Sequence, residues 1–423
     1  MHNRVIELYL QKKSENGGWE RQINGISNNE KAVLLLEKRT FKELLVDMEL
    51  RNLQNNIVGQ EASRLFARAE INMGVEAFRD SLYSLLKRNT FLNIKFENML
   101  DTLGEISRTD IRSLLGEWEK TTPLPFYSLG EPTLTKITNK GGEEFFVLKM
   151  LISNNSDYDG IIHMDIRKDG WWYQPLEDPR AKTKIEMPAH TSKEFVSVWE
   201  DQIRNVEINT MVSGNLPNII SQDINNVKQE RNKIVKDSIY ILPESSFDLP
   251  GEIIVDNEDS TLFILSAPPI VGLLPKWLDE VEETPFKYSG ISWWRPPLQW
   301  TATTNDRYYG KYIRSAFVIK SGDGSQTATW KVPVPEVGQY DLYYHVFKDD
   351  ELRWNNNLQG EYHFKVKYGS EVEDAYVNLR KANEGWEQLG SYYFDSDTIR
   401  VVLTDECKLR SVTADAVKIV KRY

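Results

Sequence analysis

The spacing of apolar residues changes twice along the chain. From the N-terminus to about Trp118, apolar residues recur every three or four positions and proline is almost absent, as expected for packed amphipathic helices. Residues 62–86 show this pattern best, with an apolar face made of Leu65, Phe66, Ala69, Met73, Phe78, Leu82, Leu85 and Leu86. Ser107 with Asp110 three residues later resembles a capping box and predicts a further helix start before the stop at Pro123.

From about Phe126 the period shifts to two, which is typical of strands. Residues 145–148 and 161–166 are predicted strands, separated by the turn-rich segment 154–157. This stretch predicts a small immunoglobulin-like β-sandwich that ends near Ser213.

Residues from about 214 to 250 are polar and weakly patterned, so we expect residues 214–292 to form a connector with one helix at most. Beyond Trp293, short strands return at regular spacing, with Gly and Asp turns between them. Their predicted positions are residues 316–319, 327–332, 340–347, 362–366 and 398–403. Such a series predicts an all-β sandwich of the jelly-roll type.

A length of 423 residues exceeds the size at which one core stops growing, so several domains are expected. The predicted class is a multidomain α plus all-β chain. Its parts are an N-terminal helical bundle, an immunoglobulin-like β-sandwich, a connector and a C-terminal jelly-roll β-sandwich, at residues 1–125, 126–213, 214–292 and 293–423.

Charge and cysteine content narrow the functional classes. The net charge of −11 disfavours a nucleic-acid partner, because such binding depends on Lys and Arg at the phosphates. A single cysteine, Cys407, excludes an intrachain disulfide and a cysteine zinc site. The most apolar stretch, residues 261–278, contains three prolines and is too irregular to span a membrane as a helix. The N-terminus lacks signal-peptide features, so we expect either a cytoplasmic chain or a piece of a longer protein.

The helical part carries a first resemblance. Residues 58–63, 71–78 and 107–111, followed by Trp118 and the prolines of residues 123–125, resemble the end of the thermolysin-like helical domain of aminopeptidase-N-type zinc metallopeptidases. The resemblance covers roughly residues 55–130 and implies that a β-domain follows the helices.

The residues that this family needs for catalysis are missing from the sequence. The family holds zinc through a His-Glu-x-x-His motif. The sequence has five histidines, and none of them belongs to such a motif: His2, His163, His190, His345 and His363. The resemblance places Gly59 where the family has a tyrosine that stabilises the tetrahedral intermediate. We therefore interpret this segment as structural, with no catalytic residue and no cofactor in the chain.

A second resemblance covers residues 293–423. Residues 315–318, 328–336, 338–343, 385–390 and 414–417 resemble, in order, the golvesin and xanthan-lyase accessory domain. The resemblance implies a jelly-roll sandwich similar to carbohydrate-binding modules, without catalytic residues, in a periplasmic or cell-surface protein of Bacteroidetes-type bacteria. Residues 353–357 and 361–363 depart from the common pattern of that domain.

Within this sandwich, several residues have predicted structural roles. We expect Trp330 and Trp386 to lie in the core, and residues 414–420 to form a central strand with Asp415 in a structural role.

An aromatic cluster before and within this domain is the candidate binding site. Aromatic faces beside amide, acid and guanidinium groups suit the apolar faces and hydroxyls of sugars. The candidates are Trp354, Trp293, Trp294, Trp300, Tyr308, Tyr309, Tyr312 and Asn355, interleaved with Arg295, Asn305, Asp306 and Arg307. The alternative is that these aromatics pack the connector against the sandwich. Trp354 is the strongest candidate because its neighbours predict a loop.

Two other features of the sequence could form metal sites. The acidic residues 256–259 could supply calcium ligands, but their spacing is not that of an EF-hand and a solvated turn is favoured. His345 and His363 could form a metal pair, although isolated histidines on strands are more often surface or core residues. We therefore predict no metal site.

The sequence thus predicts a non-catalytic binding or scaffolding portion of a bacterial cell-envelope or surface protein. Its expected partner is a polysaccharide or a cell-surface protein. Two alternatives stay open: the C-terminal half of an aminopeptidase-like metalloprotease whose zinc site lies outside this chain, and a protein-interaction module without glycan affinity.

Overall fold

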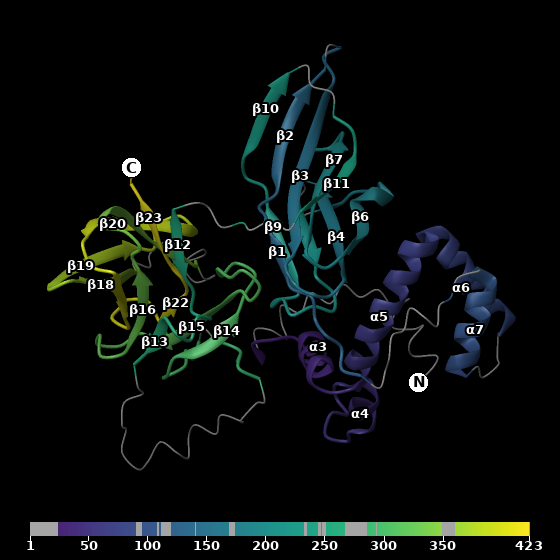
Figure 1. Cartoon of the computed structure of the whole chain (residues 1–423), viewed down its shortest axis with the longest axis horizontal. Helices are drawn as coiled ribbons and strands as arrows, with labels where there is room; N and C mark the ends of the chain where they lie inside the picture. The colour runs from purple at the N-terminus through teal and green to yellow at the C-terminus, as the bar shows by residue number, and fades with distance from the viewer. Residues whose placement is uncertain are drawn as a thin grey trace. The chain divides into compact units, whose positions relative to one another are not determined.

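The computed structural model describes residues 24–89, 95–107, 110, 120–139, 141–168, 174–231, 235–243, 247, 251–266, 286–292, 294–348 and 360–422. The chain divides into two compact units (Figure 1). Asn28–Phe247 belongs to the first unit, and Asp248–Tyr423 together with the segment that ends at Ser27 belongs to the second.

Helices occupy the start of the first unit. Their bounds are α3 Asn28–Lys38, α4 Phe41–Val46, α5 Gln54–Met73, α6 Val75–Arg88 and α7 Phe96–Ser107. The predicted apolar face over residues 62–86 is largely buried, but it belongs to two helices, because Gly74 has a φ of 83° and interrupts the helix. A capping box lies at Thr40 and Glu43. Ser107 ends α7, and the helix predicted after it lies outside the described residues.

A β-sandwich completes the first unit, with two sheets that enclose one apolar core. One sheet has the order β10-β2-β3-β7-β11, with β1 paired to β3, and the other has the order β5-β4-β8-β9, with β6 paired to β4. The bounds are β1 Tyr127–Leu129, β2 Thr133–Thr138, β3 Glu144–Asn154, β4 Gly160–Lys168, β5 Gln174–Pro175, β6 Lys182–Met187, β7 Thr191–Trp199, β8 Ile203–Asn209, β9 Ile219–Asp223, β10 Val227–Arg231 and β11 Ser238–Pro243. The strands predicted at residues 145–148 and 161–166 are β3 and β4.

The prediction that a connector with one helix follows Ser213 is wrong for residues 219–243. These residues form β9, β10 and β11, which pair with β8, β2 and β7. Strands β10 and β11 are largely exposed at the two ends of one sheet, so their residues show no burial alternation that a pattern could reveal.

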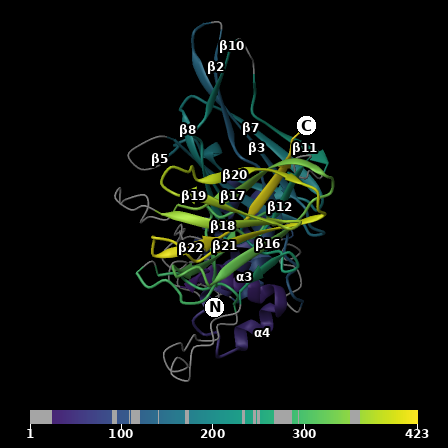
Figure 2. The same cartoon turned by 90° about the vertical axis from the view of Figure 1, so that its left-hand side faces the viewer.

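The second unit is a β-sandwich (Figure 2). Three sheets have the orders β12-β23-β17-β20, β13-β16-β21-β18-β19 and β14-β15-β22. The bounds are β12 Glu252–Val255, β13 Phe263–Leu265, β14 Thr301–Thr304, β15 Ser315–Lys320, β16 Thr327–Pro333, β17 Gly338–Val346, β18 Glu361–Tyr368, β19 Glu371–Asn378, β20 Gly385–Phe394, β21 Thr398–Thr404, β22 Ser411–Ala414 and β23 Val417–Lys421. The five strands predicted in this region are β15, β16, β17, β18 and β21.

The core of this sandwich lies between its sheets and contains residues from nearly all of its strands. Trp330 is fully buried and its indole contacts Phe263 and Tyr344, which confirms its predicted place in the core. The strand predicted over residues 414–420 is split between β22 and β23, and β23 lies centrally, between β12 and β17.

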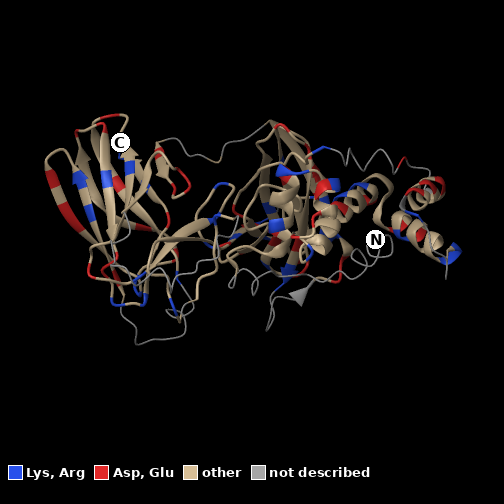
Figure 3. Ribbon diagram, turned by 90° about the horizontal axis from the view of Figure 1, so that it is seen from below, with Lys and Arg blue, Asp and Glu red and all other residues tan. Residues whose placement is uncertain are grey.

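The chain is therefore a multidomain, β-rich α plus β protein with a C-terminal β-sandwich, as predicted. None of the described helices is long and apolar enough to cross a membrane. In the view of Figure 3, acidic and basic residues are interspersed over the strands of the C-terminal sandwich.

Candidate functional site

The outward face of the sheet β12-β23-β17-β20 is the candidate functional site. In β17, Tyr340, Leu342 and Tyr344 are buried, so the alternating residues between and after them point away from the core. The pairing register then brings one set of outward residues together from three strands, the residue that follows β23 and the turn before β15. We call this set the platform: Tyr309, Asp341, Tyr343, His345, Trp386, Gln388, Ser391, Lys418 and Arg422.

Aromatic rings form one half of the platform. The ring centroid of Trp386 lies 5.0 Å from that of Tyr309 and 5.2 Å from that of His345. The ammonium of Lys418 lies 4.9 Å from the centroid of Trp386 and 5.3 Å from that of Tyr343. These mutual contacts hold the rings in fixed positions on the sheet, so they need little further ordering when a ligand binds.

A buried carboxylate fixes His345 and Tyr309. Asp415 is fully buried, its Oδ2 lies 2.8 Å from Nδ1 of His345, and its oxygens accept a hydrogen bond from the backbone N–H of Tyr309 at 3.2 Å. Burial raises the pKa of Asp415, while the contact with His345 acts in the opposite direction. Because Nδ1 is engaged, Nε2 is the ring nitrogen of His345 that can reach a ligand. The predicted structural role of Asp415 matches this geometry.

Polar groups form the other half of the platform. Asp341 accepts hydrogen bonds from Nε2 of Gln388 at 3.0 Å, from Nε of Arg422 at 2.8 Å and from the hydroxyl of Ser391. The hydrogen bond from Arg422 is the main reason why the pKa of Asp341 is lowered, so this carboxyl is ionised at neutral pH. Amide, guanidinium and carboxylate groups therefore lie on the same strands as the aromatic rings.

Such a surface suits sugars. Aromatic faces stack on the apolar C–H faces of a sugar ring, while neighbouring polar groups exchange hydrogen bonds with its hydroxyls. Four residues along a strand span roughly 13 Å, so the distance from His345 to Asp341 exceeds one sugar ring.

The predicted aromatic cluster does not form one platform. Trp293, Trp354 and Asn355 lie outside the described residues. Trp294 is 65% exposed and its ring lies 5.2 Å from the guanidinium of Arg410, away from the platform residues. Among the described candidates, only Tyr309 belongs to the platform.

The other candidates are largely structural. Trp300 packs against the core, and Tyr308 is buried with its ring centroid 4.6 Å from that of Phe347. The guanidinium of Arg307 lies 4.5 Å from the same Phe347 ring. For these residues the alternative interpretation, packing against the sandwich, is the better one.

The predicted core position of Trp386 is wrong. Its indole is half-buried and lies on the outward face, opposite His345 in the pairing of β17 with β20. Sequence reasoning did not identify Tyr343, His345 and Asp341 as site residues. The available signal is the position of Asp341 and His345 on either side of Leu342 and Tyr344 in β17, because a period of two places both of them, with Tyr343 between them, on the solvent side.

The two metal hypotheses find no support in the geometry. His345 lies on β17 and pairs with Asp415, whereas His363 lies on β18 in another sheet and contacts Asp374 at 2.7 Å. Within the described ranges, no group of three or more His, Cys, Asp or Glu side chains is arranged to hold a metal ion.

The turn predicted at residues 256–259 is present, with the backbone N–H of Asp259 donating to the carbonyl of Asp256 at 3.2 Å, but the prediction that it is solvated is wrong. Asn257 is 3% exposed, and Glu258 accepts hydrogen bonds from the hydroxyls of Tyr288 and Ser315. This acidic run is therefore partly interior, because it makes polar contacts inside the second unit.

Comparison with known proteins supports the second resemblance. Residues 296–421, which include β14 to β23, match the family model described as the Golvesin C-terminal domain. A search of curated protein sequences finds no match to the chain.

Similar solved structures cover parts of the chain only. A β-glucuronidase of Bacteroides uniformis is 13% identical, with 75% of this chain and 32% of that chain covered and a TM-score of 0.21. An aminopeptidase A of Legionella pneumophila is 14% identical, with 44% and 22% covered and a TM-score of 0.21. TmCBM61, solved with β-1,4-galactotriose, is 14% identical, with 41% and 86% covered and a TM-score of 0.15.

These TM-scores are too low to support an argument about function, and the chain spans about a third of the glucuronidase. The resemblance of residues 55–130 to zinc aminopeptidases stays a prediction. The golvesin resemblance is confirmed for residues 296–421, the part of the chain that carries most of the platform.

Proposed function

We propose that this chain is a non-catalytic, carbohydrate-binding portion of a bacterial cell-envelope or surface protein. The polysaccharide binds on the platform, with the aromatic half under one sugar and the polar half beside the next. The observation that carries the proposal is the contact group of Trp386, Tyr309 and His345 beside the hydrogen-bonded Asp341. The match to the Golvesin C-terminal domain supports it.

The proposal is tested by affinity electrophoresis of the full chain in gels that contain a panel of neutral and acidic polysaccharides. We expect retardation by at least one polysaccharide. In the Trp386→Ala variant the affinity falls by about tenfold or more, because the largest stacking surface of the platform is lost.

Trp294→Ala is the matched control, since it removes an indole from the same unit that lies outside the platform. Its retardation is expected to equal that of the unchanged chain. If Trp294→Ala lost binding and Trp386→Ala kept it, the site would lie elsewhere in the unit. If the folded chain bound no polysaccharide, a protein-interaction module would be the better account.

A further inference from the structure

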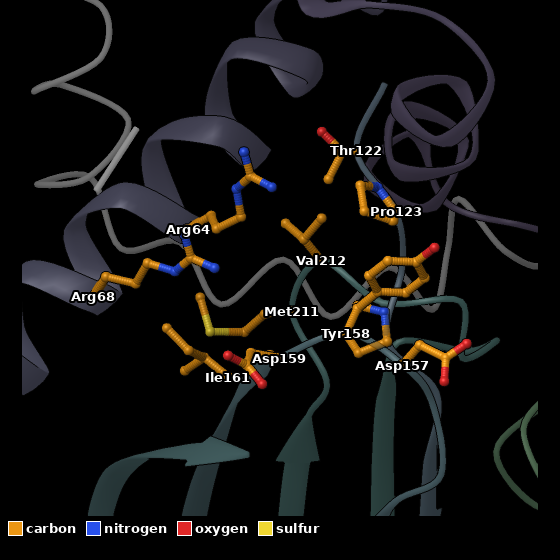
Figure 4. A pocket seen from close by; sticks show the side chains of 12 residues that line it. Arg64, Arg68, Thr122, Pro123, Asp157, Tyr158, Asp159, Ile161, Met211 and Val212 are labelled. Carbon is orange, nitrogen blue, oxygen red and sulfur yellow. The ribbon is translucent and has the colours of Figure 1, made fainter. Parts of the chain in front are cut away.

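The two arginines of the pocket beside α5 have carboxylates near them. Arg64 and Arg68 both line this pocket (Figure 4). Glu61 accepts a hydrogen bond from Arg64 at 2.8 Å, and the negative charges of Glu186 and Asp159 act on Arg68. These positive charges are therefore compensated within the first unit. A row of basic residues in the second unit is arranged differently.

This row consists of three basic residues that cross the sheet β13-β16-β21-β18-β19. Lys331 of β16 pairs with Arg400 of β21, and Arg400 also pairs with Lys367 of β18. Residues next to them on each strand are buried in the core of the sandwich, so the three basic side chains lie on the outward face of the sheet. Neighbouring strands lie roughly 5 Å apart, so the row spans roughly 10 Å. We call these three residues the basic row.

The basic row is not compensated by the described part of the chain. Arg400 and Lys367 are exposed and Lys331 is half-buried, and none of their side chains forms an ion pair with a described residue. Like charges directly opposite each other on a sheet are destabilising. The chain has a net charge of −11, so acidic residues are abundant, yet none stands in the row. An anionic ligand would relieve this repulsion.

Acidic residues border the basic row on both sides along the strands. On one side, Asp374 lies opposite Lys365 in the next outward row and contacts Nε2 of His363 at 2.7 Å. On the other side, Asp395 and Asp397 are exposed in the turn between β20 and β21. A planar anionic surface such as a membrane would meet these carboxylates as well, whereas a linear polymer that follows the row would avoid them.

We propose that the basic row binds a linear acidic polysaccharide, one that carries a carboxylate or a sulfate on most of its sugars. The polymer crosses the strands, so that successive acidic groups lie at Lys331, Arg400 and Lys367. A nucleic acid is disfavoured, because the row offers only three cationic contacts to phosphates. The site lies on the other face of the second unit from the platform, because the core separates the two sheets. The proposal rests on the proposed function only in the class of ligand.

The test compares polygalacturonate with its highly methyl-esterified form, by isothermal titration calorimetry of the full chain. The ester keeps the sugar backbone and removes most of the negative charge. We expect polygalacturonate to bind at least about tenfold more tightly than the ester, and to bind more weakly as the salt concentration rises. Equal binding of the two forms, or no binding of polygalacturonate, would overturn the proposal.

Arg400→Gln removes the central charge of the basic row. Binding of polygalacturonate is expected to fall by about fivefold or more, while the free energy of unfolding stays the same or rises, because a repulsion is lost. Lys320→Gln is the matched control, since it removes one positive charge at an exposed position of β15 in another sheet. It is expected to bind as the unchanged chain does. An equal loss in both variants would contradict a site at the row.

Two further arms separate the basic row from the platform and from a lipid surface. Trp386→Ala is expected to keep its binding of polygalacturonate, so a failure of the platform would leave this result unchanged. Loss of binding in Trp386→Ala but not in Arg400→Gln would place the polymer on the platform instead. Vesicles of phosphatidylcholine and phosphatidylserine are expected not to sediment with the chain. Sedimentation with them that is lost in Arg400→Gln would overturn the proposal in favour of a membrane.

Discussion

Asp256 is a carboxyl group whose protonation is coupled to folding. Burial and the nearby charge of Asp415 raise its pKa from 3.8 to about 8, although it accepts a hydrogen bond from the backbone N–H of Asn257 at 2.7 Å. Between these two values the folded state keeps a proton that the unfolded state has lost. The free energy of unfolding therefore falls as the pH rises through this window and levels off above it.

Asp256→Asn tests this coupling. The amide oxygen can still accept from Asn257, but the group no longer ionises, so the variant is expected to lose stability less steeply from pH 5 to pH 9. It should also be more stable than the unchanged chain at the upper end. Urea unfolding midpoints at three pH values, followed by Trp fluorescence, provide the measurement. If the dependence of the unfolding midpoint on pH were unchanged in the variant, another group would be responsible for it. Asp415 would then be the next residue to substitute, because its pKa is raised too.

At the residue scale, the sequence identified Trp330 as a core residue but could not orient Trp386. Trp330 lies in a predicted strand, whereas no strand is predicted around Trp386, and the pairing register decides which face Trp386 takes. That register contains an irregularity between Leu342 and Tyr343, where β17 pairs with β20. A shift of one residue reverses inward and outward positions, and no sequence pattern announced it.

Among the described elements, β11 presents an exposed apolar edge. It lies at the end of its sheet, and Ile239, Tyr240, Ile241 and Leu242 are 48%, 52%, 72% and 39% exposed. An apolar edge strand is a template for unwanted pairing with another chain.

Ile241→Lys is expected to change the free energy of unfolding by only about 0.5 kcal/mol or less, because the side chain is largely exposed in the folded unit. A charge on the edge should at the same time lower self-association at high concentration, measured by static light scattering. Val147→Lys, at a 2% exposed position of β3 in the same sheet, is the contrasting variant and is expected to unfold the unit. A comparable loss of stability in both variants would mean that β11 is covered in solution.

The sequence predicted elements well where one face is buried and the other exposed, as in β4 and β17. It failed at β10 and β11, where both faces meet solvent and the strand is defined by backbone pairing alone. It also treated residues 62–86 as one amphipathic pattern, because Gly74 ends a helix by its backbone angle without disturbing the apolar spacing.

In the whole molecule, the second unit is discontinuous in sequence. Gly25 belongs to it, and its carbonyl accepts a hydrogen bond from the hydroxyl of Thr304 at 2.6 Å. Gly25 has a φ of 78°, and a Cβ there would meet backbone atoms of Ser289 at 2.4 Å.

Gly25→Ala is therefore expected to destabilise the second unit, although Gly25 is separated from Asp248–Tyr423 by the segment Asn28–Phe247 of the first unit. Differential scanning calorimetry of the full chain should show two transitions, because the units have separate cores, and only one should move to lower temperature in the variant. Asp256 lies in the second unit, so the transition that changes in Asp256→Asn is the transition of the second unit. Movement of the other transition instead would contradict the division into units.

The discontinuity has a thermodynamic consequence. The whole of Asn28–Phe247 is inserted between the two pieces of the second unit, so it forms a loop of about 220 residues whenever the first unit is unfolded. Closing so long a flexible loop carries an entropic cost, and the folded first unit removes much of it by holding its own ends in place. The folded first unit therefore keeps the two segments of the second unit close to each other. A ligand that stabilises the first unit is then expected to raise the effective concentration of these two segments for each other, and so to stabilise the second unit as well.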